Sequence, residues 1–512
     1  MVFSLLAQSY LNQQILARFK RKLAKNLGYL VKNSEVFSVY QSLVKQGKIK
    51  KSKDLENLLR LKKVRSLSGI VPIAVLTKPY PCPGNCLYCP SQEGMPKSYL
   101  DDEPAVMRAS LAGFDPYLQV KRRISQLQAT GHSTDKIELI VMGGTFTVLP
   151  ESYKQNFIKG CFDAANAQRS KTLTQAQKLN QTAKNRIIGL TLETRPDQIT
   201  IDEIKNMRQL GATRVEIGVQ TINDSVLTKV NRGHGVKETI KATRLLKDAG
   251  FKVNYHLMPN LPGSSLKQDF KLFKTVFTNH NFKPDMIKIY PCVVLYQAQL
   301  YQWFKQGKFK PYSDQDLINL LLKIKKIVPP WIRIMRLGRD IPVKNIAAGN
   351  KLSNIRQILQ QQETYCQCIR CREIKQKTKP KTKLYFKTIK YQANGGQEYF
   401  LQYVDKNNKL YAMLRLRIPS QIFSQKKHFI KALENASIIR ELHTYGKALA
   451  VGKRQLKTTQ HQGLGKKLLK RAEVITKNLK LKKIAVISGI GVRQYYQNLG
   501  YQLQGNYMVK NL

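Results

Sequence analysis

The run VPIAVLTKPYPCPGNCLYCP, residues 71–90, joins an apolar, strand-like stretch to a loop that carries Cys82, Cys86 and Cys89. Three thiolates spaced CxxxCxxC on one tight loop can bind three irons of a cubane cluster and leave the fourth iron open. An open iron is what a [4Fe-4S] cluster needs in order to bind S-adenosylmethionine (SAM) and cleave it. A zinc knuckle usually has four closed ligands, and an intracellular chain seldom keeps disulfides. We therefore predict a radical-generating cluster at the end of a strand.

Six further strand-like runs follow the first, and longer helical patterns separate them. Together the runs are VPIAVLT, IELIVMGG, IIGLTLE, RVEIGVQ, FKVNYHLM, DMIKIYP and WIRIMRL, between Val71 and about Arg339. Repetition of strand, helix and strand predicts a parallel sheet. Seven such units make a complete or partial barrel of the TIM type, in which the reactive groups lie at the C-terminal ends of the strands. The predicted fold class is α/β, with the cysteine loop at the reactive end of the first strand.

The last quarter of the chain has a different pattern. The run EYFLQYVDKNNKLYAMLRLRI predicts a β-hairpin with Lys406, Asn407 and Asn408 in its turn. The strand SIIRELHTY, a helix from about Gly463, the strand KIAVISG, a helix around VRQYYQNLG and a last strand complete a compact α+β domain. We divide the chain into a basic helical segment (1–65), a barrel domain (66–340), a cysteine-containing hinge and linker (341–383) and the α+β domain (384–512).

The charge of the chain predicts a polyanionic partner. Lysine and arginine number 88 against 32 acidic residues, which gives a net charge of +56. Such a field attracts nucleic acid, although part of the excess can serve solvation alone. Residues 2–25 predict an amphipathic basic helix, which we interpret as an RNA-contacting arm; a mitochondrial presequence has the same pattern. Since neither a membrane-length apolar run nor a secretory signal is found, we expect a cytoplasmic protein with no membrane partner.

The α+β domain carries a second chemical motif, QHQGLG at residues 460–465, directly before the helical run KKLLKRAEVI. Glycines at a helix start let backbone amides approach a pyrophosphate, and the helix dipole favours its negative charge. The strand upstream ends in Glu441, Leu442, His443 and Thr444. Tyr495 and Tyr496 lie downstream, and this order matches the GNAT acetyltransferase fold, which binds acetyl-CoA. His443 fits a general base or a source of backbone contacts.

Nearly the whole chain, from about residue 65 to 512, resembles the catalytic subunit of Elongator and its single-chain prokaryotic relatives. The matching runs are SYLDDEPAVMRA, GHSTDKIELIVMGGTF, GLTLETRPD, RVEIGVQT, RGHG, NYHLMPNLPGS, KIYPC, RDIP, CQCIRCRE, RELHTYG, QHQGLG, AVISGIGVRQYYQNLGY and GNYMVK. Members of this family join a radical SAM barrel to a GNAT domain and bind tRNA. They usually have four or more residues between the first two cluster cysteines, whereas this chain has three, the spacing typical of radical SAM enzymes generally.

The resemblance implies an acyltransferase that forms 5-carboxymethyluridine at the wobble uridine (U34) of tRNA anticodons. In that chemistry, a deoxyadenosyl radical from SAM takes a hydrogen atom from the methyl group of acetyl-CoA, and the carbon radical adds to C5 of uridine. Loss of an electron and a proton, followed by hydrolysis of the thioester, completes the product. Whether the chain acts alone, as a homodimer or with accessory subunits stays open.

The resemblance also implies which residues hold each cofactor. Gly143 and Gly144, in VMGGTF, would lie at the methionyl end of SAM. The residues expected to contact acetyl-CoA are Glu441, Leu442, His443, Thr444, Leu464, Gly465, Lys466 and Tyr496. Lys136 is expected as a contact from the barrel on the resemblance alone, and Lys136 and Tyr496 are the predicted catalytic residues. Tyr495 is assigned to the core.

A second cysteine group, Cys366, Cys368 and Cys371, lies in the predicted hinge with the spacing CxCxxC. The spacing favours a structural zinc whose fourth ligand comes from elsewhere, and buried thiols without a metal are the alternative. A zinc ion here would fix the angle between the two domains. Candidates for the tRNA path, or for general surface charge, are Arg333, Arg336, Arg339 and the run KQKTKPKTK.

Three other functions fit parts of this pattern. A protein lysine acetyltransferase with a structural radical SAM domain would be expected to offer basic tails an acidic groove, which a charge of +56 does not favour. A tRNA methylthiotransferase would need further cluster cysteines and would leave the acetyl-CoA motif unused. A non-catalytic tRNA scaffold would bind no iron and would not cleave SAM.

Overall fold

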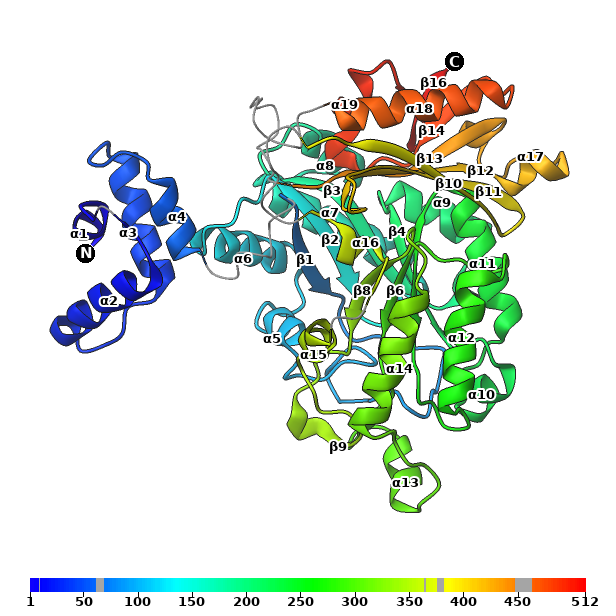
Figure 1. Ribbon diagram of the computed structural model, residues 1–512, viewed down its shortest axis with the longest axis horizontal. Coiled ribbons are helices and arrows are strands. Elements are labelled where there is room, and N and C mark those ends of the chain that lie inside the picture. Colours follow the sequence, from blue (N-terminus) through cyan, green and yellow to red (C-terminus); the bar gives the residue numbers. More distant parts are fainter. Residues whose placement is uncertain (9, 61–68, 363–364, 375–381, 447–462) are drawn as a thin grey trace.

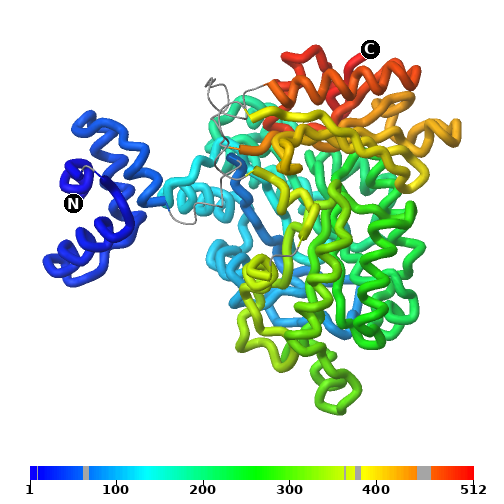
Figure 2. Tube along the Cα trace, viewed as in Figure 1, coloured from blue at the N-terminus to red at the C-terminus, as the bar shows by residue number. Residues whose placement is uncertain are grey.

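The computed structural model describes residues 1–512 except 9, 61–68, 363–364, 375–381 and 447–462. A small helical unit at the N-terminus projects from a barrel, and a second sheet covers one end of that barrel (Figure 1). The trace in Figure 2 shows the same three parts in sequence order, from blue to red. None of the helices in the described ranges is long and apolar enough to cross a membrane.

The N-terminal unit contains four helices, α1 (Val2–Leu6), α2 (Gln13–Leu27), α3 (Asn33–Lys45) and α4 (Lys53–Leu59), around a small core of their own. The predicted single helix over residues 2–25 is therefore wrong. The Asn12 side chain accepts a hydrogen bond from the Ile15 amide at 2.8 Å, so that α2 begins anew with its own N-cap. Arg60 attaches the unit to the barrel by donating to the Gly131 carbonyl at 2.7 Å.

The seven strands that the sequence predicts form a parallel barrel sheet, in which they lie in the order β1-β2-β3-β4-β5-β6-β8. They are β1 (Val71–Leu76), β2 (Lys136–Met142), β3 (Arg186–Thr194), β4 (Arg214–Gln220), β5 (Lys252–Leu257), β6 (Met286–Ile289) and β8 (Arg333–Leu337). Alternate residues, such as Ile137, Leu139 and Val141 in β2, face the apolar core under the surrounding helices. Because β1 and β8 end the described order, the barrel is partial, and the predicted α/β class is confirmed.

Helices cover the outer face of this sheet (Figure 1). The helices in the described part of this region are α5 (Pro104–Ser110), α6 (Pro116–Ala129), α7 (Glu151–Asn166), α8 (Leu173–Asn180), α9 (Ile201–Gln209), α10 (Asp224–Lys229), α11 (Val236–Asp248), α12 (Leu266–Thr278), α13 (Leu300–Lys305), α14 (Asp314–Ile327), α15 (Ile355–Gln361) and α16 (Ile369–Arg372). Of these, α13 projects below the barrel instead of covering the sheet (Figure 1). A short antiparallel pair is formed by β7 (Val294–Leu295) and β9 (Ile346–Ala348). Its residues Val294 and Ala348 belong to the same apolar cluster as Leu87 of the cysteine loop.

The C-terminal domain contains a second seven-stranded sheet in the order β10-β11-β12-β13-β14-β16-β15. Its elements are β10 (Tyr385–Ala393), β11 (Gly396–Val404), β12 (Leu410–Ile418), α17 (Ser420–Ser424), β13 (Ala436–Thr444), α18 (Leu464–Asn478), β14 (Lys483–Val486), α19 (Arg493–Gln497), β15 (Gln502–Gln504) and β16 (Tyr507–Asn511). Strands β11 and β12 form the predicted hairpin. Parallel pairing of β13 with β14 ends at Ile439 and Val486, beyond which β13 continues without β14.

A buried ionic network joins the C-terminal sheet to the N-terminal ends of the barrel strands. Arg440, on β13, donates to Asp285 Oδ1 at 2.9 Å and to both carboxylate oxygens of Glu398 at 3.2 Å. Arg417 pairs with Asp248 at 2.7 Å. Asp285 and Asp248 lie just before β6 and at the end of α11, so the second sheet covers the end of the barrel opposite the C-terminal ends of its strands. Burial raises the pKa of Asp285, but Arg440, Lys247 and Arg415 outweigh it and lower that pKa.

Candidate functional site

The cysteine loop lies at the C-terminal end of β1 and is held by backbone hydrogen bonds. The Leu87 amide donates to the Val230 carbonyl at 3.0 Å, and the Leu300 amide donates to the Leu87 carbonyl at 2.8 Å. Leu87 and Tyr88 pack in an apolar cluster with Val230 and Leu300. The loop is therefore anchored by its apolar residues, while Cys82 and Cys89 are only half-buried.

Each cluster cysteine has a different environment. Cys86 Sγ accepts a hydrogen bond from Arg232 Nη1 at 3.3 Å, and Cys82 Sγ lies 3.5 Å from Thr145 Oγ1. Burial and the neighbouring Cys86 raise the pKa of the Cys89 thiol to about 11, so a metal would have to displace its proton. In the described part of the chain, the sulfurs of Cys82, Cys86 and Cys89 do not all lie within 4.8 Å of one another. Such a spread suits a cubane, in which each thiolate binds a different iron.

Two glycines form the C-terminal end of β2 beside this loop. Gly143 has φ +133° and Gly144 has φ +92°, in the region that side chains rarely adopt. A Cβ at Gly143 would overlap the Thr77 hydroxyl at the end of β1, and one at Gly144 would lie 3.2 Å from the Lys97 carbonyl. Both positions therefore require glycine, because the chain packs closely against them and holds them at positive φ, at the same end of the barrel as the cysteines.

A group of charged residues on the inner face of the barrel escaped the sequence reasoning. His256, on β5, lies 2.9 Å from Glu216 on β4 and 3.5 Å from Glu193 on β3. Tyr99 donates to Glu193 at 2.6 Å, and Lys288 pairs with Glu216. Burial raises the pKa of Glu216, but Lys288, His256 and Arg214 hold it well below its usual range. The sequence does contain a pattern that indicates this group: charged residues alternate with apolar ones in β4 and β5, although a barrel buries both faces of its strands.

The hinge cysteines come together closely. The sulfurs of Cys366, Cys368 and Cys371 all lie within 4.8 Å of one another. Hydrogen bonds from the other two thiols lower the pKa of Cys368, which favours a thiolate. No fourth histidine, cysteine or carboxylate joins them among the residues placed in the structure. Cys368 is buried in the barrel core just after α15, where the chain leaves the barrel for the C-terminal sheet.

The predicted acetyl-CoA strand, β13, presents two faces at its end. Glu441 faces the barrel, and Arg415 Nε, from the neighbouring strand β12, donates to it at 2.8 Å. The His443 ring lies against Tyr445, with ring centroids 4.3 Å apart and the planes tilted by 44°, and burial lowers the pKa of His443 to about 4. Leu442 packs in the core of the C-terminal domain, and both Leu442 and Thr444 lie 3.9 Å from the position that a Cβ on Gly465 would occupy.

The predicted glycine loop leads into α18, whose first residues are Leu464, Gly465 and Lys466. Residues 460–462 lie outside the described residues, so only Gly463, with φ +70°, represents the loop. The Tyr495 hydroxyl lies 3.3 Å from the Cβ position of Gly465, and Tyr495 is 38% exposed. Tyr496 is buried in the core of the C-terminal domain. The assignment of Tyr495 to the core is therefore wrong, and Tyr495 is a further candidate for the contact that the sequence assigned to Tyr496.

Lys136 is the first residue of β2, at the end of the barrel that faces the C-terminal domain. Burial lowers its pKa. The three arginines proposed for the tRNA path are engaged in ion pairs: Arg333 with Glu373 at 2.6 Å, Arg336 with Asp340, and Arg339 with Glu103 at 2.9 Å. The linker run falls mostly at residues 375–381, outside the described residues.

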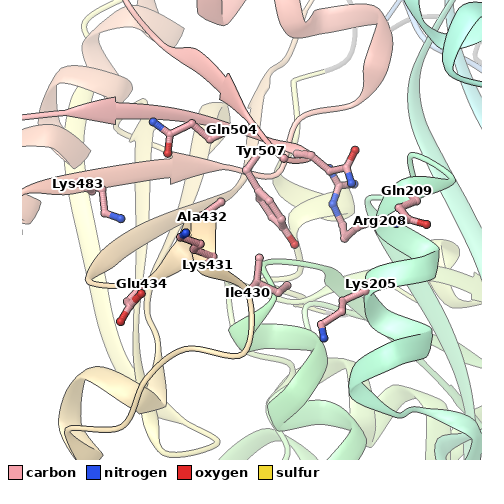
Figure 3. A pocket seen from close by; sticks show the side chains of 12 residues that line it. Lys205, Arg208, Gln209, Ile430, Lys431, Ala432, Glu434, Lys483, Gln504 and Tyr507 are labelled. Carbon is pink, nitrogen blue, oxygen red and sulfur yellow. The ribbon is translucent and has the colours of Figure 1, made fainter.

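A cavity of about 580 Å³ at the seam between the two domains contains none of these residues (Figure 3). It is lined by Lys205, Arg208, Gln209, Ile430, Lys431, Ala432, Glu434, Lys483, Gln504, Gly505, Asn506 and Tyr507. Its walls come from α9, from the segment 430–434 before β13, from Lys483 of β14 and from the turn between β15 and β16. The hollow is therefore not the site that the motifs define.

Comparison with known proteins places these features in a family. The radical SAM superfamily model matches residues 80–273, and the radical SAM C-terminal domain model matches residues 284–364. The chain is 46% identical to the tRNA uridine(34) acetyltransferase of Methanocaldococcus infernus over 92% of this chain and 91% of that protein. It is 41% identical to human Elongator complex protein 3, covering 89% of this chain and 86% of that protein.

A solved structure supports the same relationship. The structure of Methanocaldococcus infernus Elp3 with an N-terminal deletion superposes with a TM-score of 0.75 at 43% identity, covering 87% of this chain and all of that one. Both the barrel and the C-terminal sheet thus have counterparts in one protein of known structure. The chain belongs to the radical SAM family of the tRNA uridine(34) acetyltransferases and Elongator complex protein 3.

Proposed function

We propose that this protein is a cytoplasmic acyltransferase that modifies the wobble uridine of tRNA by radical SAM chemistry, with acetyl-CoA as the source of the added carbons and 5-carboxymethyluridine as the product. The observation that carries the proposal is the pairing of an open-site cysteine loop with a C-terminal acyltransferase-like sheet in one chain. Relatives named tRNA uridine(34) acetyltransferase cover nearly the full length of that pairing.

The cysteine loop fits a [4Fe-4S] cluster. Cys82, Cys86 and Cys89 would hold three irons, and the bound cluster would supply the electron that cleaves SAM. Arg232 donates to Cys86 Sγ and so stabilises negative charge on that sulfur. Gly143 and Gly144 lie at the neighbouring strand end, where the methionyl group of SAM would bind.

The end of β13 fits the pantetheine arm of acetyl-CoA. Within the described residues, the parallel pairing of β13 with β14 stops at Ile439, and the strand continues past it to Thr444, where the pantetheine arm would lie. The residues proposed to contact acetyl-CoA are Lys136, Glu441, Leu442, His443, Thr444, Leu464, Gly465, Lys466 and Tyr496. Tyr495 joins this set because its hydroxyl lies at the start of α18. Lys136 and Tyr496 stay the proposed catalytic residues.

Cys366, Cys368 and Cys371 fit a structural zinc, since three thiols within reach of one ion match the usual ligand set. The ion would stiffen the chain where it passes from the barrel to the C-terminal sheet. We retain the division into a helical segment (1–65), a barrel domain (66–340), a hinge (341–383) and a GNAT domain (384–512) as part of this proposal.

The proposal is tested by SAM cleavage in the anaerobically reconstituted protein. Formation of 5'-deoxyadenosine should need tRNA or acetyl-CoA for its full rate and should be abolished in Cys86→Ala, while Cys161→Ala, a buried core cysteine, should retain it. Cleavage that persists in Cys86→Ala would refute the cluster assignment. Label from acetyl-CoA that appears on a basic protein, with tRNA unmodified, would favour the protein lysine acetyltransferase instead.

A further inference from the structure

A short projection of the chain lies beside the cysteine loop. Residues 296–310 contain α13 and extend beyond the end of the barrel at which that loop lies (Figure 1). Backbone hydrogen bonds tie the projection to the loop: the Leu300 amide donates to the Leu87 carbonyl at 2.8 Å. Just beyond the loop, the Ser91 amide donates to the Gln297 carbonyl at 3.1 Å. The projection therefore has a fixed place next to the proposed cluster.

The projection has an inner side and an outer side. Leu300 is buried, and Trp303 and Phe304 pack against the apolar cluster of the cysteine loop. Tyr296, by contrast, is 51% exposed. Its ring meets the ring of the half-buried Tyr301 edge to face, with the centroids 5.2 Å apart and an angle of 66° between the planes. Packing on the cysteine loop accounts for the inner side and leaves the outer pair of tyrosines without a structural role.

The composition of this part of the chain favours a nucleic acid as its partner. Of the 23 residues from 291 to 313, six are aromatic, against 9% in the whole chain. The same stretch has three exposed lysines, Lys305, Lys308 and Lys310, and no aspartate or glutamate. Lys305 Nζ lies 5.8 Å from the centroid of the Tyr301 ring, so positive charge and aromatic surface occur together. The cores of protein interfaces are depleted in lysine, whereas grooves for single-stranded nucleic acid combine basic side chains with aromatic rings.

We propose that Tyr296 and Tyr301 form a stacking surface for unpaired bases of the tRNA anticodon loop, next to the uridine that is modified, and that Lys305 binds the backbone phosphates. Every base has a flat π face, so a tyrosine ring accepts any base that is not already stacked within a helix. A base that enters an active site leaves its neighbours in the stack, and the exposed faces of those neighbours match these rings. The inference rests on the proposed function, since it needs the anticodon loop to reach the cysteine loop.

Binding of an anticodon stem-loop to the full-length reconstituted protein tests this surface. Tyr296→Ala should weaken binding of the stem-loop at least about fivefold, the usual loss when a stacked base loses its aromatic partner. Binding of an RNA duplex of the same length, which offers no unpaired bases, should be unchanged. Tyr296→Phe keeps the ring and should bind the stem-loop as the wild type does. Phe423→Ala is the matched control, because Phe423 is 59% exposed on α17, at the other end of the barrel, and its loss should leave binding unchanged.

The salt dependence of binding separates stacking from charge. Lys305→Gln should reduce the slope of log Kd against log salt concentration by about one, because one phosphate contact is lost, whereas Tyr296→Ala should leave that slope unchanged. Stem-loop binding by both variants as tight as by the wild type would overturn the inference and leave the proposed function standing. Equal losses of stem-loop and duplex binding in Tyr296→Ala would mean that this tyrosine only supports the fold, and would also overturn the inference. A wild-type protein that binds no tRNA would overturn both the inference and the proposed function.

Discussion

Replacing Arg440 with methionine should weaken the contact between the two domains and lower the free energy of unfolding. The Arg440 side chain is fully buried and donates to Asp285 of the barrel, to Glu398 of the C-terminal sheet and to the Phe251 carbonyl at 2.7 Å. Removing one partner from such a network leaves the negative charge of the buried carboxylates only partly neutralised. The free energy of unfolding then usually falls by about 3–5 kcal/mol. Arg415, Arg417 and Lys247 remain near the two carboxylates, so we expect the lower half of that range.

The loss can be measured by urea unfolding followed by tryptophan fluorescence. Trp331 stacks on Tyr391 of β10 with ring centroids 4.3 Å apart, so its emission reports on contact between the domains. The second tryptophan, Trp303, is replaced by phenylalanine in every protein compared, which leaves one reporter. Lys510→Met is the control, since Lys510 pairs with Glu473 where both side chains are partly exposed, and its loss should cost at most about 1 kcal/mol. An Arg440→Met loss no larger than that of the control would refute the reasoning.

Three other outcomes are expected. Gly143→Ala should weaken SAM binding at least tenfold, because its Cβ would overlap Thr77, whereas Gly94→Ala, with φ +71° but open space around it, should not; equal affinities would refute a role for Gly143. Cys368→Ser should lose zinc, measured by elemental analysis, and keep iron; unchanged zinc would exclude the hinge site. Because burial lowers the pKa of His443 to about 4, the unfolded chain binds the extra proton between pH 6.5 and 4. Stability from this group is therefore complete above pH 6.5 and falls by on the order of 2 kcal/mol by pH 5, a loss absent in His443→Gln melting curves; parallel curves would contradict it.

Much of the fold follows from short apolar runs, but the short strands β7, β9 and β15 and the longer strand β10 do not. The seven barrel strands were predictable because short runs rich in β-branched and other apolar residues recur between longer helical patterns, even where charged residues alternate with the apolar ones. Strand β10 is largely exposed, so its sequence YFKTIKYQA has no such run. The turn after it, Asn394–Gly395 with φ +52° and +73°, is a strong hairpin signal and could have revealed the strand.

The candidate site was predictable only where it is local in sequence. The cysteines and glycines are each grouped in one loop, so their spacing predicts them. The pairing of His256 with Glu193 and Glu216 brings together three strands far apart in the chain, which spacing cannot reveal. Arg415 and Arg417 alternate with apolar residues as in an exposed strand, yet both are buried, because acidic residues of the barrel face them.

The most direct test of the whole account follows carbon from acetyl-CoA into tRNA. Reconstituted protein is incubated anaerobically with tRNA, SAM, dithionite and acetyl-CoA labelled in its methyl group, and the digested nucleosides are analysed by mass spectrometry. The account predicts label in 5-carboxymethyluridine that is absent with Cys86→Ala. Unlabelled tRNA from a protein that binds both iron and acetyl-CoA would contradict it.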